Sequence, residues 1–326
     1  MVHAIQVEKT GKPSVLTPVD IDLPELQVHE VRIRHNAIGI NFIDTYYRSG
    51  LYPAPEGLPF IPGSEGAGVI IALGEAVSNF SVGDRVAYAG SLGAYSEERN
   101  IPASVLVRIP ESVSDEQAAA LMLKGMTARY LLRETYKVTA ETTLLCHAAA
   151  GGVGLIVGQW ARALGARVIG TVGSTEKMDL ARANGYEYVI NYREEDWVAR
   201  VCEITHGRGC DVVYDSVGKD TFPASLDCIR PRGLWCSFGQ SSGPIADFSM
   251  SLLSQKGSLF ATRPTLFDYT AERWELEKTV EDLFTAVANG IVKVQINQRY
   301  PLKEAVKAHA DLEARKTTGA SVLVPD

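Results

Sequence analysis

The sequence has little that would place it in a membrane or on a nucleic acid. It lacks an unbroken run of about 18 apolar residues, which a membrane-spanning helix needs. The first residues, MVHAIQVEKTGKPSVL, lack the basic start and apolar stretch of a secretory signal. Positive charge is not in excess either, because 32 Lys and Arg face 39 Asp and Glu, for a net charge of −7. We therefore expect a cytoplasmic protein without a membrane or nucleic-acid partner.

Cysteine is also scarce, and the few residues form no pattern. The five cysteines are odd in number and include no C-x-x-C pair: Cys146, Cys202, Cys210, Cys228 and Cys236. This excludes a disulfide framework and a cysteine-based metal cluster, so we expect reduced, mostly buried thiols. The six histidines show no ligand spacing: His3, His29, His35, His147, His206 and His309.

The chain is long enough for two domains, since it has 326 residues and a hydrophobic content of 46%. From residue 1 to about 120 it predicts short strands separated by Gly and Pro. From about 140 to 263 strands alternate with helices, which is typical of βαβ units and a parallel sheet. The elements after residue 263 break this alternation and are expected to rejoin the first part. The predicted fold is therefore α/β, with a β-rich domain and a doubly wound parallel-sheet domain.

A glycine-rich turn, HAAAGGVG, covers residues 147–154. The pattern Ala149-x-Gly151-x-x-Gly154 follows an apolar strand and precedes a helix, as in dinucleotide-binding proteins. Gly151 would let the backbone approach a pyrophosphate, and Gly154 would let the helix pack closely on the strand. Ala149 replaces the usual first glycine, which is tolerated if the turn needs no positive φ there. The turn predicts a dinucleotide cofactor; the alternative is an ordinary strand-to-helix turn.

The end of the second predicted strand, RVIGTV, lacks an acidic residue. It is followed by Gly173, Ser174 and Thr175, and then by Lys177. An acid at this place commonly binds the ribose of NAD and would repel a 2′-phosphate, whereas a small residue, a hydroxyl and a lysine accept one. The predicted cofactor is therefore NADPH. Glu176 lies on the first turn of the next helix and is expected to point to solvent, and a solvated surface role for Lys177 is the alternative.

Ten short segments in order carry a family resemblance: NFIDTYYRSGLYP, PGSEGAG, GDRV, GAYSE, LKGMTA, HAAAGGVG, VINYREED, VVYDSVG, SLDC and RGLWCSFG. Together they resemble the zinc-free bacterial NADPH:quinone oxidoreductases, related to zeta-crystallin, of the medium-chain dehydrogenase/reductase superfamily. The resemblance runs nearly end to end. It implies a GroES-like catalytic domain over residues 1–123 and 264–326, with a Rossmann NADPH-binding domain over 124–263. It also implies a homodimer through the last Rossmann strands, GLWCSFG and GSLFATR.

The zinc ligands of the related alcohol dehydrogenases are missing. Those enzymes carry a cysteine in the segment matching GINFID and a histidine in the segment matching PGSEGAG, where this sequence has Asn41 and Ser64. The four-cysteine lobe is missing too, since GAYSEERNIP contains no cysteine. We therefore expect no metal. Without a Lewis acid an alcohol or ketone is hard to activate, whereas a quinone accepts hydride readily once it is held close to the nicotinamide.

The resemblance also implies the site residues. A loop, NFIDTYYRSGLYP, would supply the candidate catalytic residues Asn41, Tyr46 and Tyr52, with Phe42 as a further cofactor contact beside Asn41 and Tyr46. Tyrosine offers a flat apolar face and a hydroxyl to an aromatic acceptor, although Tyr46 and Tyr52 as mere packing residues are the alternative. Among the other implied cofactor contacts, Thr127 and Tyr130 would lie near the nicotinamide half, and Gly152 and Val153 on the pyrophosphate. Ser174, Lys177 and Tyr192 would surround the 2′-phosphate. The remaining implied contacts are Gly173, Ser216, Val217, Phe238, Gly239, Gln240 and Arg263. For Arg263 a structural salt bridge is the alternative.

The expected activity is transfer of reducing equivalents from NADPH to a small-molecule quinone without metal. One alternative is reduction of an enone or alkenal, because the same scaffold can deliver hydride to an activated alkene. Another is a non-catalytic, crystallin-like protein that binds NADPH or RNA. The acidic charge balance argues against RNA.

Overall fold

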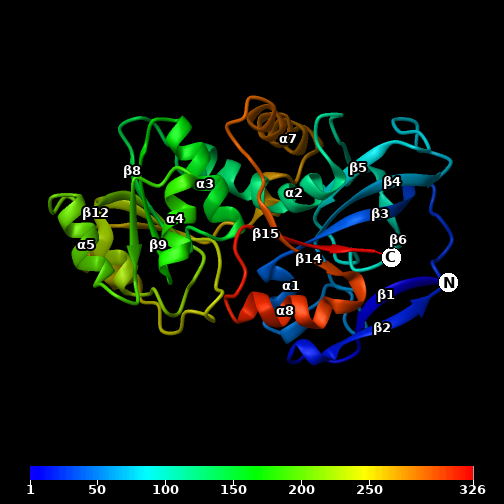
Figure 1. Cartoon of the computed structure of the whole chain (residues 1–326), viewed down its shortest axis with the longest axis horizontal. Helices are drawn as coiled ribbons and strands as arrows, with labels where there is room; N and C mark the ends of the chain where they lie inside the picture. The colour runs from blue at the N-terminus through cyan, green and yellow to red at the C-terminus, as the bar shows by residue number, and fades with distance from the viewer. Residues whose placement is uncertain (326) are drawn as a thin grey trace. The chain divides into compact units, whose positions relative to one another are not determined.

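The computed structural model describes residues 1–325, and the chain divides into two compact units (Figure 1). Unit 1 contains Met1–Met126, Thr270–Phe284 and the described residues from Val294 on. Unit 2 contains Thr127–Tyr269 and Thr285–Lys293. Each unit is built on its own main β-sheet.

Unit 1 has a seven-stranded sheet in the order β14-β15-β3-β4-β5-β7, with β6 paired to β3 beside this path. Its strands are β3 (Glu30–Ile40), β4 (Glu65–Leu73), β5 (Arg85–Ala89), β6 (Glu98–Pro102), β7 (Val107–Arg108), β14 (Ile296–Pro301) and β15 (Ala320–Val324). A separate antiparallel pair is formed by β1 (Val2–Val7) and β2 (Leu16–Ile21). Because β15 pairs with β3, the end of the described chain completes the sheet that the first hundred residues begin.

The helices of unit 1 include α1 (Phe42–Ser49) and α8 (Ala305–Glu313), which contact each other and lie side by side in Figure 1. The prediction of a loop over residues 41–53 is therefore wrong. A helix forms because the Asp44 carboxylate accepts a hydrogen bond from the backbone N of Asn41, and Gly50 ends the helix with a φ of 84°. Two longer helices, α2 (Asp115–Tyr130) and α7 (Arg273–Ala288), begin in residues of unit 1 and end in residues of unit 2.

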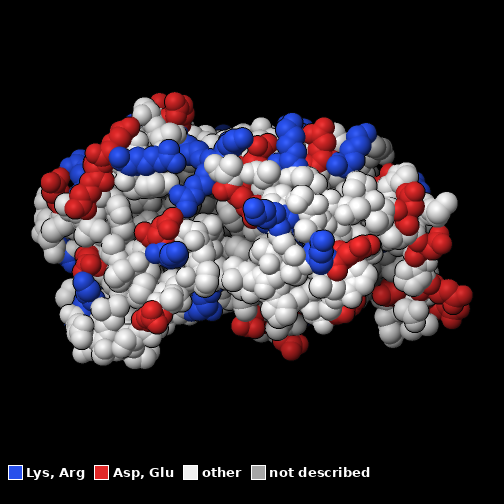
Figure 2. Space-filling model, turned by 90° about the horizontal axis from the view of Figure 1, so that it is seen from below, with Lys and Arg blue, Asp and Glu red and all other residues white. Residues whose placement is uncertain are grey.

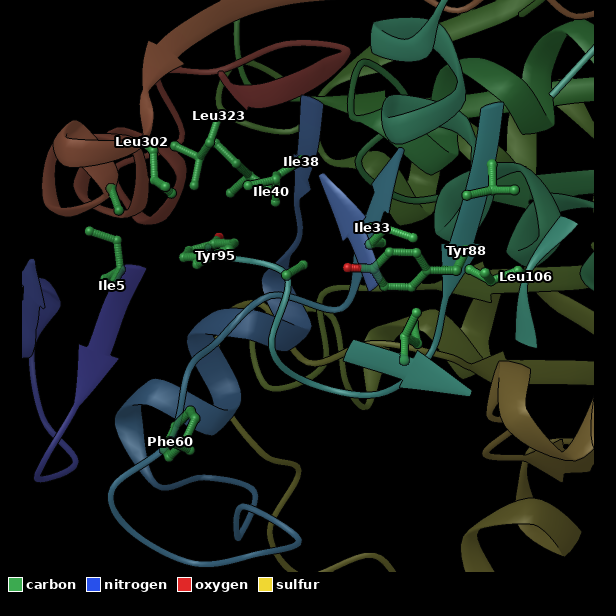
Figure 3. Packing of buried hydrophobic residues seen from close by; sticks show 14 of the residues in the cluster. Ile5, Ile33, Ile38, Ile40, Phe60, Tyr88, Tyr95, Leu106, Leu302 and Leu323 are labelled. Carbon is green, nitrogen blue, oxygen red and sulfur yellow. The ribbon is translucent and has the colours of Figure 1, made fainter. Parts of the chain in front are cut away.

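The core of unit 1 joins strands that are far apart in the sequence (Figure 3). Tyr95 and Tyr88 are fully buried in it. Figure 3 shows Ile38, Ile40 and Leu323 gathered near Tyr95, so β3 and β15 share this apolar layer. Removing this apolar surface from water holds the ends of β3 and β4 in place. The polar cluster described below is built on those strand ends.

Unit 2 is a six-stranded parallel sheet in the order β10-β9-β8-β11-β12-β13. Its strands are β8 (Thr143–Cys146), β9 (Arg167–Val172), β10 (Tyr188–Asn191), β11 (Cys210–Asp215), β12 (Ile229–Ser237) and β13 (Phe260–Thr262). Its helices include α3 (Gly152–Ala163), α4 (Thr175–Ala183), α5 (Trp197–Ile204) and α6 (Met250–Gln255). This is the Rossmann strand order, in which the chain reverses direction across the sheet beside β8. The predicted α/β fold with a doubly wound sheet is confirmed.

One connection of unit 2 departs from the predicted alternation of strands and helices. Between β11 and β12 the segment FPASLDCI forms only a short 3₁₀ turn, Ala224–Cys228, in place of a full helix. On the face drawn in Figure 2, Lys and Arg side chains are interspersed with Asp and Glu. Among the helices of residues 1–325, none has the length and apolar character needed to cross a bilayer.

Candidate active site

A buried ion pair lies at the start of β4 in unit 1. Glu65 is completely buried, and its Oε1 accepts hydrogen bonds from Asn41 Nδ2 at 2.8 Å and Lys124 Nζ at 2.5 Å. Its Oε2 accepts from the backbone N of Leu123 at 2.7 Å. A Cβ on Gly39 would lie 2.1 Å from Oε1, so the neighbouring strand needs glycine there. The ion pair thereby fixes the amide of Asn41, a candidate quinone contact.

A second buried carboxylate lies one helical turn from Asn41. The Asp44 carboxylate accepts from the backbone N of Asn41 at 2.9 Å, from Ser64 Oγ at 2.8 Å and from Tyr95 OH at 3.3 Å. Burial raises the pKa of Asp44 to about 7; the hydrogen bonds from Ser64 and Asn41 oppose this shift, and the charge of Glu65 adds to it. A carboxyl group that titrates near neutral pH can give up or accept a proton under ordinary conditions.

The candidate tyrosines lie together at the end of α1. The rings of Tyr46 and Tyr52 meet edge to face with centroids 5.2 Å apart, and Phe42 lies 6.5 Å from Tyr46. The backbone N of Tyr52 donates to the carbonyl of Tyr46 at 3.1 Å. Tyr46 is 8% exposed, whereas Tyr52 is half-buried. The structure thus brings Asn41, Phe42, Tyr46 and Tyr52 into one helix and its end; their contact with a quinone stays a prediction.

The glycine-rich turn of unit 2 shows why its first glycine is dispensable. The left-handed conformation falls on Ala148, with a φ of 54°, and not on Ala149. The Ala149 side chain instead packs against β9, where a Cβ on Gly170 would lie 2.6 Å from its Cβ. A Cβ on Gly154 would lie 2.4 Å from the carbonyl O of Ala148, so α3 packs close to the turn. Gly151 is the N-cap of α3, which leaves the first amides of this helix directed at the turn.

The corner after β9 contains the predicted 2′-phosphate residues. Ser174 caps α4 by accepting from the backbone N of Lys177 at 3.4 Å. A Cβ on Gly173 would lie 2.5 Å from the hydroxyl of Tyr192 and 3.5 Å from Nε of Arg193. Glycine at residue 173 therefore allows Tyr192 to lie over the corner. A second cation, Arg193, also lies near this corner and was not among the predicted contacts. A carboxylate is not remote, however: the exposed Glu176 has a lowered pKa because of a backbone hydrogen bond and a hydrogen bond from Ser174.

The other predicted cofactor contacts follow the ends of neighbouring strands. Ser216 and Val217 come directly after β11, and Phe238, Gly239 and Gln240 come directly after β12. Arg263 has a structural contact at this edge, because its Nη1 donates to the carbonyls of Ser237 at 2.7 Å and Gly239 at 2.9 Å. Arg263 thereby ties the residue after β13 to the loop after β12. A phosphate contact of Arg263 stays a prediction.

Two of the predicted nicotinamide contacts are deeply buried in unit 2. Thr127 is 6% exposed and Tyr130 is 2% exposed. The ring of Tyr130 is stacked on Tyr269, with centroids 4.4 Å apart and an interplanar angle of 9°. Burial raises the pKa of Tyr130, so its hydroxyl keeps its proton. The side chain of Tyr130 serves the packing of this unit in the structure, and its contact with the nicotinamide half is untested.

The candidate metal positions bear polar side chains that are used elsewhere. Asn41 donates to Glu65 and Ser64 donates to Asp44. Within residues 1–325, no group of three or more His, Cys, Asp and Glu side chains is placed to hold a metal ion.

The buried charges that organise the polar cluster of unit 1 were not among the predicted site residues. Glu65 and Lys124 belong to PGSEGAG and LKGMTA, and each is a single charge within an apolar or glycine-rich segment. Such a charge is seldom buried without a partner, so their presence was a usable signal. The buried Asp44 gave a weaker signal, because an acid in a first helical turn is common.

Two segments of the chain match family models, which together define the class of protein to which the chain belongs. Residues 27–111 match the family model described as "Alcohol dehydrogenase GroES-like domain", and residues 152–279 match the one described as "Zinc-binding dehydrogenase". This pair of models defines an oxidoreductase of the medium-chain dehydrogenase/reductase type.

Individual relatives narrow the class further. The chain is 53% identical over 326 residues to a quinone oxidoreductase of Pseudomonas aeruginosa, which covers 100% of both chains. It is 44% identical to a 2-haloacrylate reductase of a Burkholderia species, covering 100% of this chain and 99% of the relative. The crystal structure of Escherichia coli quinone oxidoreductase complexed with NADPH has a TM-score of 0.97 and 50% identity, covering 99% of this chain and 100% of that one. The chain belongs to the zinc-free quinone oxidoreductases of this superfamily.

Proposed function

We propose that this NADPH-dependent quinone oxidoreductase binds NADPH through the strand ends of unit 2 and contacts the quinone through Asn41, Tyr46 and Tyr52 of unit 1. The bound NADPH supplies the hydride. Glu65 and Lys124 hold the Asn41 amide, and the two tyrosines offer apolar faces and hydroxyls to the ring of the acceptor. Asp44 and Ser64 hold an exchangeable proton beside the backbone of Asn41.

The corner after β9 carries the choice of cofactor in this proposal. Gly173 and Ser174 leave room and a hydroxyl, and Lys177 and Arg193 supply positive charge for a 2′-phosphate. Glu176 is the opposing feature, since its carboxylate takes a hydrogen bond from Ser174. NADPH binding would have to release this hydroxyl toward the phosphate, while the two cations offset the charge of Glu176.

The test compares NADPH with NADH in quinone reduction. Lys177→Ala should lower kcat/KM for NADPH about tenfold, the value of one charge-assisted hydrogen bond, and leave that for NADH almost unchanged. Lys137→Ala is the control, because Lys137 is exposed and precedes the amino end of β8, at the opposite edge of the sheet from the strand ends. A wild-type preference for NADH, or an equal loss with both cofactors, would remove the assignment.

The quinone contacts are tested separately from the cofactor corner. Tyr52→Phe keeps the apolar ring but removes the hydroxyl, and Tyr52→Ala removes both. If Tyr52 contacts the acceptor, the alanine variant should raise KM for 1,4-benzoquinone about tenfold or more and leave KM for NADPH unchanged. A panel that includes 2-haloacrylates and enones shows whether activated alkenes are also substrates; faster turnover of alkenes than of quinones would favour the alternative activity.

A homodimer through the edge of the unit 2 sheet is the proposed assembly. Strand β13 is an edge strand, and Phe260 on it is 64% exposed. Pairing β13 with a second copy would cover both the unpaired backbone and this side chain. Phe260→Asp should convert a dimer to a monomer in light scattering, whereas Trp274→Asp, at a residue that is 62% exposed in unit 1, should not. A wild-type monomer in solution would contradict the proposed homodimer.

We also propose a cytoplasmic location, which cell fractionation tests.

A further inference from the structure

Asp215, the last residue of β11, organises two loops at once. Its Oδ1 accepts hydrogen bonds from the backbone N of Val217 at 2.9 Å and of Gly218 at 3.1 Å. Its own carbonyl O accepts from the backbone N of Phe238 at 2.8 Å and of Gly239 at 3.2 Å. One residue therefore holds the backbone after β11 with its side chain and the backbone after β12 with its main chain. Both loops contain predicted cofactor contacts.

The carboxylate of Asp215 is fully buried, and within residues 1–325 none of its hydrogen bonds comes from a cation. The remaining donors to it are neutral: Thr221 Oγ1 at 2.8 Å, Ser225 Oγ at 3.0 Å and Trp235 Nε1 at 3.4 Å. Desolvating a carboxylate is costly, so these donors and the two loop amides must all be in place to stabilise it. The conformation of the two loops and the hydrogen bonding of this carboxylate therefore depend on each other.

The same network reaches the other cofactor-binding strand ends. The hydroxyl of Ser225 donates to Asp215, so the Ser225 Oγ is the acceptor for Nε2 of His147 at 3.0 Å. Nδ1 of His147 is then without a proton and accepts from the hydroxyl of Thr171 at 2.8 Å. Burial lowers the pKa of His147, which favours this neutral form. His147 immediately precedes the left-handed Ala148 of the glycine-rich turn. The strand ends of β8, β9 and β11 are thus linked by buried hydrogen bonds.

We propose that Asp215 is a positioning residue for the nicotinamide half of NADPH, acting through the backbone of Ser216–Gly218 and Phe238–Gly239. This inference rests on the proposed function, in which NADPH binds at the strand ends of unit 2 and its 2′-phosphate at the corner after β9. The loops after β11 and β12 lie on the other side of β8 in the sheet, so we assign them to the nicotinamide half. The adenosine half is assigned to the separate corner of Gly173, Ser174 and Lys177. The two halves of the cofactor should therefore respond differently to a change at Asp215.

The hydrogen-bond pattern predicts which substitutions are tolerated. The partners of Oδ1 include two backbone amides, which can only donate, so an acceptor is required there. The main partners of Oδ2 are hydroxyls, which can reverse: Ser225 Oγ also lies 3.1 Å from the carbonyl of Thr221, and Thr221 Oγ1 lies 3.0 Å from that of Gly218. Asparagine can therefore place its oxygen on the amides and its NH2 on the hydroxyls, and only the 3.4 Å contact from Trp235 Nε1 loses its acceptor. Alanine leaves both amides without an acceptor.

The experiment measures NADPH and half-cofactor binding in the full-length enzyme. Asp215→Ala should lower kcat/KM for NADPH about 10- to 100-fold, because two loop amides lose their acceptor. Asp215→Asn should stay within about threefold of the wild type, since it keeps an acceptor for them. Both variants should bind 2′,5′-ADP, which carries the adenosine half alone, with an unchanged Kd. Asp227→Ala is the control, because Asp227 is a half-exposed carboxylate of the same unit that pairs with Lys256 at its surface.

The outcomes separate the inference from the proposed function. Equal losses in Asp215→Asn and Asp215→Ala, or a weaker affinity of Asp215→Ala for 2′,5′-ADP that matches the NADPH loss, would overturn the positioning role. Failure of the wild type to bind 2′,5′-ADP would instead overturn the cofactor assignment. If Asp215→Ala does not fold, hydrogen exchange decides: the Val217 and Gly218 amides should be protected without cofactor in the wild type and in Asp215→Asn. Fast exchange of these amides in the wild type would refute the inference.

Discussion

Breaking the buried ion pair between Glu65 and Lys124 should destabilise unit 1 more than removing it entirely. Their side chains are 0% and 7% exposed, so neither charge can turn to water when the other is removed. Lys124→Met leaves the carboxylate with only the neutral donors Asn41 and Leu123, and should lower the free energy of unfolding by about 3–5 kcal/mol. Glu65→Gln leaves a buried ammonium and should cost a similar amount.

The double variant Glu65→Gln/Lys124→Met contains neither charge and should cost only about 1–2 kcal/mol, because the desolvation penalty disappears with the pair. The resulting coupling energy, about 4 kcal/mol or more, is measured by urea titration followed by far-UV circular dichroism. A matched cycle at Asp179 and Arg182, an exposed pair 3.3 Å apart on α4, should give a coupling below about 0.5 kcal/mol. Additive effects at Glu65 and Lys124 would refute the reasoning.

Stability should also depend on pH. Burial lowers the pKa values of His35 and His309 from 6.5 to about 3. Between these pH values the unfolded chain binds more protons than the folded one, so each histidine lowers the free energy of unfolding by up to about 1.4 kcal/mol for each pH unit of acidification. The raised pKa of Asp44, about 7, has the opposite effect, because between pH 3.8 and 7 the folded chain holds a proton that the unfolded chain releases. Asp44→Asn removes this effect, so the free energy of unfolding should fall more between pH 7 and pH 5 than in the wild type when both are measured by urea titration. An equal fall in the two proteins would contradict this. Asp44→Asn should also remove an inflection near neutral pH from the kcat profile for quinone reduction, if Asp44 supplies the proton; a retained inflection would assign it to another group. Gly154→Ala should weaken NADPH binding about tenfold or more in fluorescence titration, because the added Cβ would displace the Ala148 carbonyl. Gly90→Ala is the control, since the space around Gly90 is open. Equal affinities of the two variants would show that the glycine-rich turn can shift to make room for the Cβ.

The periodic part of the fold was predictable from the sequence. Strands β8 to β11 are apolar segments separated by helical ones, which is the pattern of a buried parallel sheet. The glycine-rich turn was equally readable, because its position between a strand and a helix defines it. The placement of the left-handed residue was not predictable, since Ala148 adopts it where glycine would be the usual choice.

Helix α1 and the polar networks escaped prediction for different reasons. Helix α1 has only eight residues, and its Tyr and Thr side chains favour a helix weakly, although Asn41 and Asp44 gave a readable start signal. The networks join residues that are distant in sequence: Glu65 and Lys124 are 59 positions apart, and His147 and Ser225 are 78 apart. Pairing at such separations is created by the tertiary fold, and a single sequence contains no periodic signal for it.

The hydroxyl of Tyr192 over Gly173 constrains how this enzyme could change its coenzyme. Conversion to NADH would call for a carboxylate after β9, yet any side chain at residue 173 would begin 2.5 Å from that hydroxyl. The first step of such a conversion therefore requires the Tyr192 side chain, which is 37% exposed, to turn away or to be replaced by a smaller one. Residues 173 and 192, which follow the adjacent strands β9 and β10, therefore have to be redesigned together if the coenzyme is to be changed.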